Sequence, residues 1–255
     1  MRKKNKKNIA IFIIAYQAVT TFDKVIKRIP KNIYKEVKEI FLIDDSSNDN
    51  TYYAALGYKH VHKIKKLSIY RNQKNLGYGG NQKKGYNYAM QKGHDIVVML
   101  HGDAQYAPEA LGAILQPLID DKADMVFGSR MIGNPLKGGM PLYKFLGNKF
   151  LTFMENLLLG MNLTEFHSGY RAYSCSALKK IPFSKCSNDF HFDTEILIQF
   201  KEKGLRIKEV PIPTYYGDEI SRVKIFRYGF NVLKSVFQYL LHKKGIIYVE
   251  KYDIK

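Results

Sequence analysis

Short apolar runs rich in β-branched residues recur along the first half of the chain, and stretches of helical pattern separate them. The runs are residues 9–15, 40–43, 67–70, 96–100 and 125–127. Their length and composition are typical of buried strands. Strands that alternate with helices favour parallel pairing, because the helix supplies the crossover. The order predicts an α/β fold of Rossmann-like type: a doubly wound, mostly parallel sheet with helices on both faces.

End signals place the helices of this fold. Residues 25–29 form the end of a short helix before Pro30, residues 78–91 a helix closed by Gly93, and residues 108–119 a third helix. A glycine- and proline-rich loop after Arg130 precedes further elements, expected as helices at 142–159 and 192–203 and strands at 172–173 and 207–212.

Polar residues follow three of the apolar runs directly. They are Tyr16 and Gln17, then the stretch from Asp44 to Asn48, then the stretch from His101 to Gln105. In open parallel sheets ligands bind beyond the carboxyl ends of the strands, so these residues are expected to share one ligand-binding edge. Ordinary capping is the alternative, with Ser47 or Asp49 capping the next helix, but capping leaves the adjacent Asp44 and Asp45 unexplained.

Asp103 is the candidate metal ligand of this edge. Magnesium takes one or two protein carboxylates and fills its other positions with phosphate oxygens and water, and Gln105 could contact the ion or its water shell. Other phosphate folds find no support, because no P-loop motif occurs and Gln82 stands where a dinucleotide-binding GxGxxG motif would need its third glycine. No GxSxG or HExxH motif occurs either.

Eight stretches in order resemble the family-two glycosyltransferases, and specifically the branch that contains dolichol-phosphate mannose synthases and polyprenyl-phosphate glycosyltransferases. They are IIAYQA, LIDDSSNDNT, NLGYGGNQKKGYNYA, LHGDAQYAPE, FGSR, FHSGYRAY, FHFDTEI and EVPIPTYYGDEIS, over about residues 8–225. The resemblance implies the GT-A fold and inverting transfer from a nucleotide sugar with Mg²⁺ or Mn²⁺.

The resemblance also assigns roles to residues. It implies donor contacts from the strand ends, with Tyr16 stacking on the base and Asp45 holding the ribose; the donor-binding set is Ile14, Tyr16, Ile43, Asp45, His101 and Gly102. Asp103 and Gln105 would bind the metal. The catalytic set is Asp103, Arg130, Arg171, Arg222 and Asp193, in which the arginines would meet phosphate oxygens as bidentate donors.

Three positions depart from the family pattern. Ala18 replaces a glutamate expected to help hold the nucleotide, and Thr214 replaces an arginine of the phosphate cluster. His101 replaces the first aspartate of the Asp-x-Asp motif. A neutral imidazole at this position could ligate metal or contact ribose, and the alternative is a histidine bonded to backbone.

The expected domain organisation is a basic tail at 1–7, a GT-A domain at 8–225, and an amphipathic helix and tail at 226–255. Within the domain, residues 8–130 would bind the nucleotide sugar and residues 131–225 the acceptor.

The expected function is metal-dependent transfer of a hexose from a GDP- or UDP-sugar to dolichyl or undecaprenyl phosphate. Phosphate is already an anionic nucleophile, so positioning and charge neutralisation would suffice. The alternative is transfer to a hydroxyl in surface glycan synthesis, with Asp193 or Glu195 as the base. A nucleic-acid-binding role is disfavoured, because no nucleic-acid-binding motif accompanies the positive net charge of the chain, +18.

The net charge of +18 and an apolar stripe at residues 226–241 favour a peripheral membrane location. The stripe comprises Phe226, Phe230, Leu233, Phe237 and Leu240. A stripe that packs on the protein's own core, a second copy of the chain or a membrane-anchored partner stays open as the alternative. Two cysteines without a metal or disulfide pattern favour a reducing compartment, so the expected location is the cytoplasmic face of a membrane.

Overall fold

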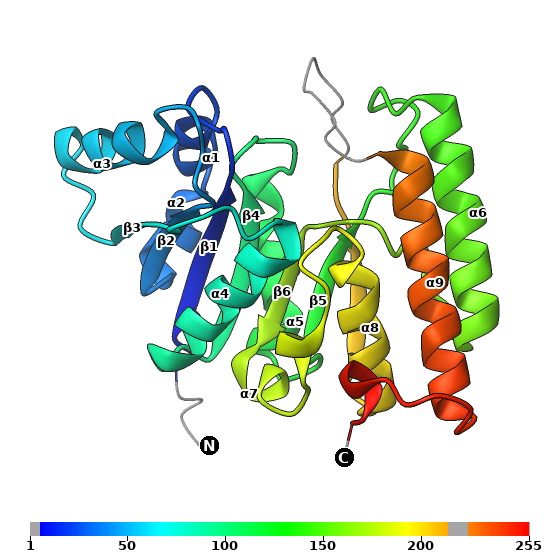
Figure 1. The fold of residues 1–255 in the computed structure, drawn as a ribbon. Helices are drawn as coiled ribbons and strands as arrows, with labels where there is room; N and C mark the ends of the chain where they lie inside the picture. The colour runs from blue at the N-terminus through cyan, green and yellow to red at the C-terminus, as the bar shows by residue number, and fades with distance from the viewer. Residues whose placement is uncertain (1–5, 214–223, 255) are drawn as a thin grey trace.

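The computed structural model describes residues 6–213 and 224–254. One seven-stranded sheet in the order β3-β2-β1-β4-β6-β5-β7 forms its centre (Figure 1). The strands are β1 (Ile9–Ala15), β2 (Glu39–Asp44), β3 (Leu67–Arg71), β4 (Ile96–His101), β5 (Met125–Ser129), β6 (Arg171–Ser174) and β7 (Ile207–Pro211). All neighbours pair in parallel except β6, which is antiparallel to both β4 and β5. The predicted mostly parallel sheet is confirmed.

The predicted helices are present with changes at their ends, and the structure adds two short helices that were not predicted, α2 and α7. The helices are α1 (Phe22–Lys27), α2 (Lys31–Glu36), α3 (Thr51–Val61), α4 (Tyr78–Gln91), α5 (Leu111–Ile119), α6 (Leu142–Leu159), α7 (Cys175–Leu178), α8 (Phe192–Glu202) and α9 (Ile225–Lys243). Short 3₁₀ turns are η1 (Pro108–Ala110), η2 (Phe183–Lys185) and η3 (Glu250–Tyr252). The single helix expected at 108–119 is therefore a 3₁₀ turn followed by α5.

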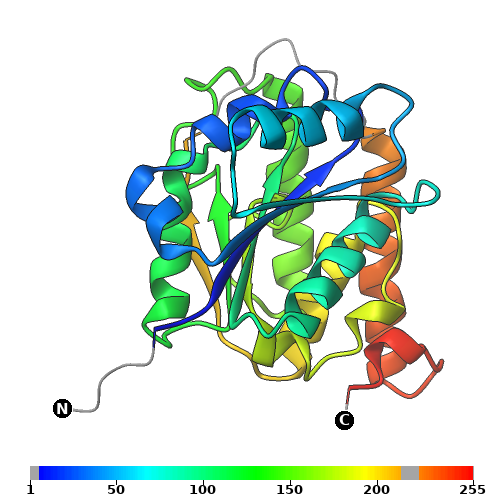
Figure 2. The same cartoon turned by 90° about the vertical axis from the view of Figure 1, so that its left-hand side faces the viewer.

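Alternate residues of β1 point to opposite faces of the sheet, and both faces are covered. Phe12 and Ile14 belong to one apolar core together with residues of α4, α8 and α9. Ile11 and Ile13 belong to a second core with residues of α1 and α5. Figure 2 shows these helices on the two sides of the twisted sheet. Full burial of β1 explains why its sequence is continuously apolar rather than alternating.

Helices α6 and α9 run side by side at one end of the molecule (Figure 1). Helix α9 packs on α8 and α6 and buries Val232, Ser235, Val236 and Tyr239. Strands from residues 8–130 and from residues 131–225 share the one sheet, so the two expected halves have no separate cores. Within residues 6–213 and 224–254, no helix is both long and apolar enough to cross a bilayer.

Candidate active site

The carboxyl ends of β1, β2 and β4 lie at one edge of the sheet, because these three strands are parallel neighbours. Shortly after each strand the chain turns through a residue of positive φ: Gln17 (51°), Ser46 (57°) and Ala104 (63°). Side chains other than glycine rarely adopt this conformation. The abrupt turns, rather than extended continuation, bring the predicted polar residues together at this edge.

Asp103 lies two residues beyond the end of β4 and is partly exposed. Its Oδ1 accepts a hydrogen bond from the backbone N–H of Gln105 at 3.1 Å. Gly102 is buried in the turn after β4, where an added Cβ would lie 3.2 Å from the Cβ atoms of Ala15 and Ala18 at and just after the end of β1. Only a residue without a side chain fits there without displacement, so Gly102 lets β4 end close to β1 and presents Asp103 at the edge.

Tyr16 is 37% exposed at the end of β1, and base stacking stays a prediction for it. Ile14 and Ile43 are different, because their side chains are buried in the apolar core. The carbonyl oxygen of Ile43 accepts a hydrogen bond from Asn81 Nδ2 at 3.1 Å. In this structure neither isoleucine presents a side chain to a donor nucleotide.

Asp45 is buried and organises the loop that leads into α4. Its carboxylate accepts hydrogen bonds from Asn72 Nδ2 (2.7 Å), Leu76 N (2.9 Å) and Gly77 N (3.0 Å). Any contact of Asp45 with a nucleotide would add to these bonds.

Asp44 is buried beside Asp45 and has a different environment. It accepts a hydrogen bond from the hydroxyl of Ser47, and its Oδ2 lies 3.4 Å from Nε of Arg71. Burial raises the pKa of Asp44 against the opposing effects of Ser47 and Arg71. Both adjacent aspartates therefore stabilise the loops that follow the end of β2. This accounts for the pair, which helix capping alone does not explain.

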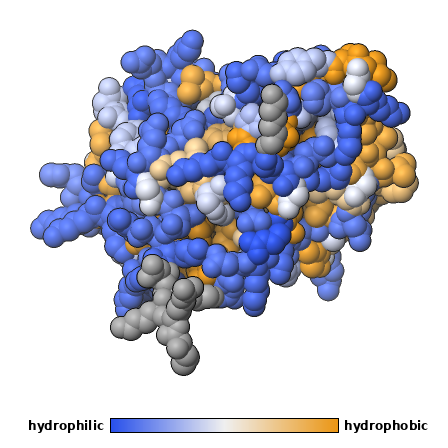
Figure 3. Space-filling view, turned by 90° about the horizontal axis from the view of Figure 1, so that it is seen from below, coloured by the Kyte–Doolittle hydropathy of each residue, from blue (hydrophilic) through white to orange (hydrophobic). Residues whose placement is uncertain are grey.

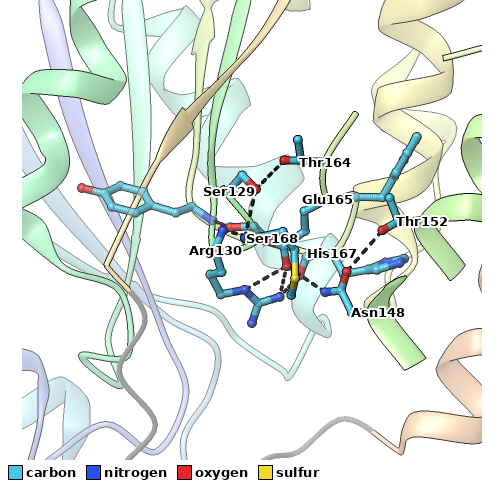
Figure 4. A network of polar contacts seen from close by, with 12 residues as sticks. Ser129, Arg130, Asn148, Thr152, Thr164, Glu165, His167 and Ser168 are labelled. Atoms are coloured by element: carbon cyan, nitrogen blue, oxygen red, sulfur yellow. Dashed lines mark hydrogen bonds and ion pairs between the residues drawn. The ribbon is translucent and has the colours of Figure 1, made fainter. Parts of the chain in front are cut away.

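Arg130 follows β5 and is anchored by a buried carboxylate that the sequence analysis did not identify. Its Nε donates to Glu165 Oε1 at 2.8 Å, and its backbone N–H donates to Oε2 at 2.7 Å. Asn148 of α6 donates to the same carboxylate at 2.9 Å. Figure 4 shows the three side chains converging. Burial alone would raise the pKa of Glu165, but the charge and hydrogen bonds of Arg130 hold it below its ordinary value.

Arg171 does not face the edge of the sheet, which corrects its expected role as a phosphate ligand. Its side chain is fully buried, and its guanidinium donates to the carbonyl oxygens of Ser168 (2.8 Å), Asp193 (2.7 Å) and Phe166 (2.7 Å). All three acceptors are backbone groups, so Arg171 holds the chain in place beneath the site. Its Nε also lies 3.8 Å from Asp193 Oδ1 in a buried ion pair. The SGYR pattern by itself does not reveal which way the arginine points.

Asp193 lies at the start of α8 and is nearly buried. Tyr78 Oη donates to its Oδ2 at 3.1 Å, and Gln82 Nε2 donates to its Oδ1 at 3.1 Å. Tyr78 also lies 3.4 Å from His101 Nε2. Tyr78 thus connects two predicted site residues, although it was not singled out from its stretch NLGYGG. Because the contact joins residues 115 positions apart, the sequence pattern could not show it.

Glu195, a candidate base in the sequence, does not face the edge of the sheet. It is fully buried and accepts hydrogen bonds from Ser187 N (2.6 Å), Ser235 Oγ (3.0 Å) and Lys251 Nζ (2.5 Å). These bonds tie α8 to the C-terminal segment, so its role in this structure is structural. Arg222 and Thr214 lie outside the described residues.

The donor set at the edge suits a metal that is shared with a diphosphate. In the described part of the chain, no group of three His, Cys, Asp or Glu side chains could hold an ion by itself. Magnesium nevertheless needs only one or two protein carboxylates when phosphate oxygens and water complete its shell, and Asp103 offers one that is partly exposed. Asp103, with Gln105 beside it, would hold such an ion.

This arrangement of sheet, strand-end carboxylate and flanking helices defines the GT-A fold of glycosyltransferases. Glucosyl-3-phosphoglycerate synthase of Mycobacterium tuberculosis, crystallised with Mn²⁺, UDP-glucose and phosphoglyceric acid, superposes with a TM-score of 0.68 at 18% identity, over 96% of this chain and 82% of that chain.

The chain belongs to glycosyl transferase family 2, whose sequence model matches residues 10–182. It is 33% identical over 252 residues to the UDP-N-acetylglucosamine–dolichyl-phosphate N-acetylglucosaminyltransferase of Methanococcus voltae, over 94% of this chain and 97% of that protein. It is 28% identical over 188 residues to the undecaprenyl-phosphate mannosyltransferase of Micrococcus luteus, over 73% and 75% of the two chains. The predicted family and the assignment as a glycosyltransferase are confirmed.

Proposed function

We propose that this glycosyltransferase moves a hexose from a GDP- or UDP-sugar to a polyprenyl phosphate with inversion at the anomeric carbon. The observation that carries the proposal is the similarity, along nearly the whole chain, to a relative named for transfer to dolichyl phosphate. The chemistry is consistent with it, because an anionic phosphate can attack the anomeric carbon without a general base once it is positioned. The bond from that carbon to the diphosphate breaks as the new bond forms.

The residues of the edge divide this work. Tyr16 and the loop braced by Asp45 would bind the nucleotide, and Arg130, held rigidly by Glu165, would offer its guanidinium to phosphate oxygens. A Mg²⁺ or Mn²⁺ ion at Asp103 would neutralise charge on the leaving diphosphate. The neighbour from Mycobacterium tuberculosis was crystallised with Mn²⁺ and a UDP-sugar, which supports a divalent ion here.

Transfer to a hydroxyl is the second candidate function, and Asp193 is the observation that favours it. Tyr78 bridges the Asp193 carboxylate to His101 at the edge of the sheet, which is where a general base would be needed. Glu195 is fully buried in an ion pair with Lys251. Asp193, whose side chain is 7% exposed and lies 3.8 Å from Arg171, is the base that this alternative would require.

Two exposed apolar stripes support a location at a membrane surface. On α9, Phe226 (95% exposed), Phe230 (68%) and Phe237 (51%) of the expected stripe face outward. Leu233 and Leu240 are only partly exposed, and Leu240 packs against the core. Helix α6 adds a second stripe, in which each side chain is more than half exposed: Leu142, Leu146, Phe150, Phe153 and Leu157. The two helices are neighbours, and Figure 3 shows apolar side chains along this side of the molecule.

Basic residues border the two stripes. Lys149 on α6 and Arg227, Lys234 and Lys244 on or just after α9 are exposed. Each basic residue near an anionic leaflet contributes about 1 kcal/mol, and a fully buried phenylalanine contributes about 1.5–3 kcal/mol. We therefore propose that α6 and α9 lie on the anionic cytoplasmic leaflet, so that the enzyme meets the phosphate head of a lipid acceptor without crossing the membrane.

The test is incubation with a panel of UDP- and GDP-sugars, Mg²⁺ or Mn²⁺, and a short polyprenyl phosphate, followed by mass analysis of the lipid. The matched control is the same polyprenol without its phosphate. Glycosylated polyprenyl phosphate in the complete mixture, and none after chelation of the metal, is the expected result. Transfer to the polyprenol, or to neither lipid with any donor, would reject the proposal, and the former would favour hydroxyl transfer.

A further inference from the structure

Four residues from four separate segments meet at the end of β4, and we call them the His101 cluster: Tyr78, His101, Gly169 and Asp193. His101 Nε2 lies 3.2 Å from the carbonyl oxygen of Gly169 and 3.4 Å from Tyr78 Oη. Tyr78 in turn donates to Asp193 Oδ2 at 3.1 Å. The cluster therefore joins the end of β4 to the start of α4, the loop before β6 and the start of α8.

The hydrogen-bonding groups of the cluster allow only one assignment of donors and acceptors. The Gly169 carbonyl can only accept, so the proton of the imidazole lies on Nε2. Burial and the nearby Asp193 raise the pKa of Tyr78 well above its ordinary value, so its hydroxyl remains a donor to that carboxylate. The oxygen of Tyr78 is then free to accept a second, weaker bond from His101.

Close packing holds the imidazole in place. Its ring lies 4.8 Å from the ring of Tyr106 and 5.6 Å from that of Tyr78, between centroids. A Cβ atom added at Gly169 would lie 2.6 Å from both His101 Nε2 and Tyr78 Oη, which leaves no room for a side chain. Tyr106 Oη also accepts a hydrogen bond from the N–H of Gly169 at 2.8 Å. Both polar groups of the Gly169 backbone are thus used.

An aspartate at position 101 could not replace these contacts. A carboxylate only accepts hydrogen bonds, whereas the Gly169 carbonyl needs a donor. The aspartate would also place a second negative charge near Asp193, with only Tyr78 between them. The exchange of aspartate for histidine in this chain therefore changes the role of the position.

We propose that His101 is a positioning residue rather than a ligand of the metal or the ribose. Its Nε2–H binds the Gly169 carbonyl and Tyr78, and Tyr78, together with Gln82 and Arg171, holds the carboxylate of Asp193. Its importance for sugar transfer rests on the proposed function, whereas its contacts do not. A metal at this edge would then be held on the protein side by Asp103 without help from position 101.

The test compares two substitutions that each keep one of the two ring nitrogens. Glutamine can place an amide N–H near Nε2, and asparagine can place one near Nδ1. We expect His101→Gln to keep kcat within about fivefold of the wild type, the equivalent of about one neutral hydrogen bond. We expect His101→Asn and His101→Asp to lower kcat by about 10- to 100-fold through loss of positioning, with the dissociation constant of Mn²⁺·UDP unchanged.

Two further measurements keep the test decisive. Tyr78→Phe should reproduce the loss in His101→Asn, and His62→Asn on the exposed end of α3 is the matched control without effect. Nitrogen-detected NMR of the wild-type His101 imidazole should show the proton on Nε2. This measurement uses the wild type alone, so it remains possible when the substituted proteins do not fold. If the wild type transfers no sugar to polyprenyl phosphate, the proposed function fails. The NMR result would still test the contact between His101 Nε2 and the Gly169 carbonyl.

Three results would overturn the inference. One is activity retained in His101→Asn or His101→Asp but lost in His101→Gln. The second is a weakened affinity for Mn²⁺·UDP in all three variants, which would indicate a ligand. The third is a proton on Nδ1 in the wild type.

Discussion

Replacing Arg130 with alanine would test the buried ion pair that anchors the edge of the site. Glu165 is fully buried, and the side chain of Arg130 is only 16% exposed. Removing one partner of such a pair leaves an uncompensated charge and typically costs about 3–5 kcal/mol. Asn148 still donates to the carboxylate in the variant, so we expect the lower end, a loss of about 3 kcal/mol in unfolding free energy at neutral pH.

The contribution of Glu165 to the pH dependence of stability should reverse its sign in this variant. In the wild type the pKa of Glu165 is held below its ordinary value of 4.5, chiefly because Arg130 outweighs the effect of burial. The pair therefore stabilises the fold above pH 4.5, and this contribution is lost as the pH falls through the lowered pKa. Without Arg130, burial raises the pKa, so the variant should lose stability as the pH rises towards neutrality.

The assay is urea denaturation of both proteins at pH values between 4 and 8. Arg28→Ala is the matched control, because Arg28 forms an exposed pair with Glu109 whose loss should cost less than about 1 kcal/mol. Glu165→Gln in the Arg130→Ala background should recover part of the loss at neutral pH. A loss equal to that of the control, or a parallel pH profile in wild type and variant, would refute the reasoning.

Three other predictions follow from the site and the surface. Asp103→Ala should abolish transfer and leave thermal unfolding unchanged, because it removes a partly exposed ligand; activity that survives removal and restoration of metal would contradict the assignment. Asp45→Ala should lower the unfolding free energy by about 2 kcal/mol by leaving buried donors unpaired, and should weaken donor binding in calorimetry; unchanged donor affinity would place the nucleotide elsewhere. The double variant Phe150→Ser, Phe230→Ser should lose flotation with anionic liposomes at low salt, whereas Tyr53→Ser on exposed α3 should not; equal flotation of both would reject the membrane face.

Local sequence patterns determined most of the secondary structure. The predicted bounds of α4 and α6 agree with the structure, and β1 was read correctly from its continuous apolar run. These signals work because helix and strand periodicity and end signals are properties of neighbouring residues. The same patterns predicted that Tyr16, Asp45 and Asp103 would gather at one edge, since parallel strands end on the same side of a sheet.

The tertiary structure alone decided which polar groups face the edge and which are buried beneath it. Arg171 and Glu195 are charged residues in a basic chain, yet both are fully buried. Backbone carbonyls and the Asp193 carboxylate compensate Arg171, and Lys251, 56 positions away, compensates Glu195. Glu165 and Tyr78 became visible as site residues only through partners 35 and 115 positions away. A buried charge must be compensated, but the compensating group can come from anywhere in the chain, and only the fold specifies it.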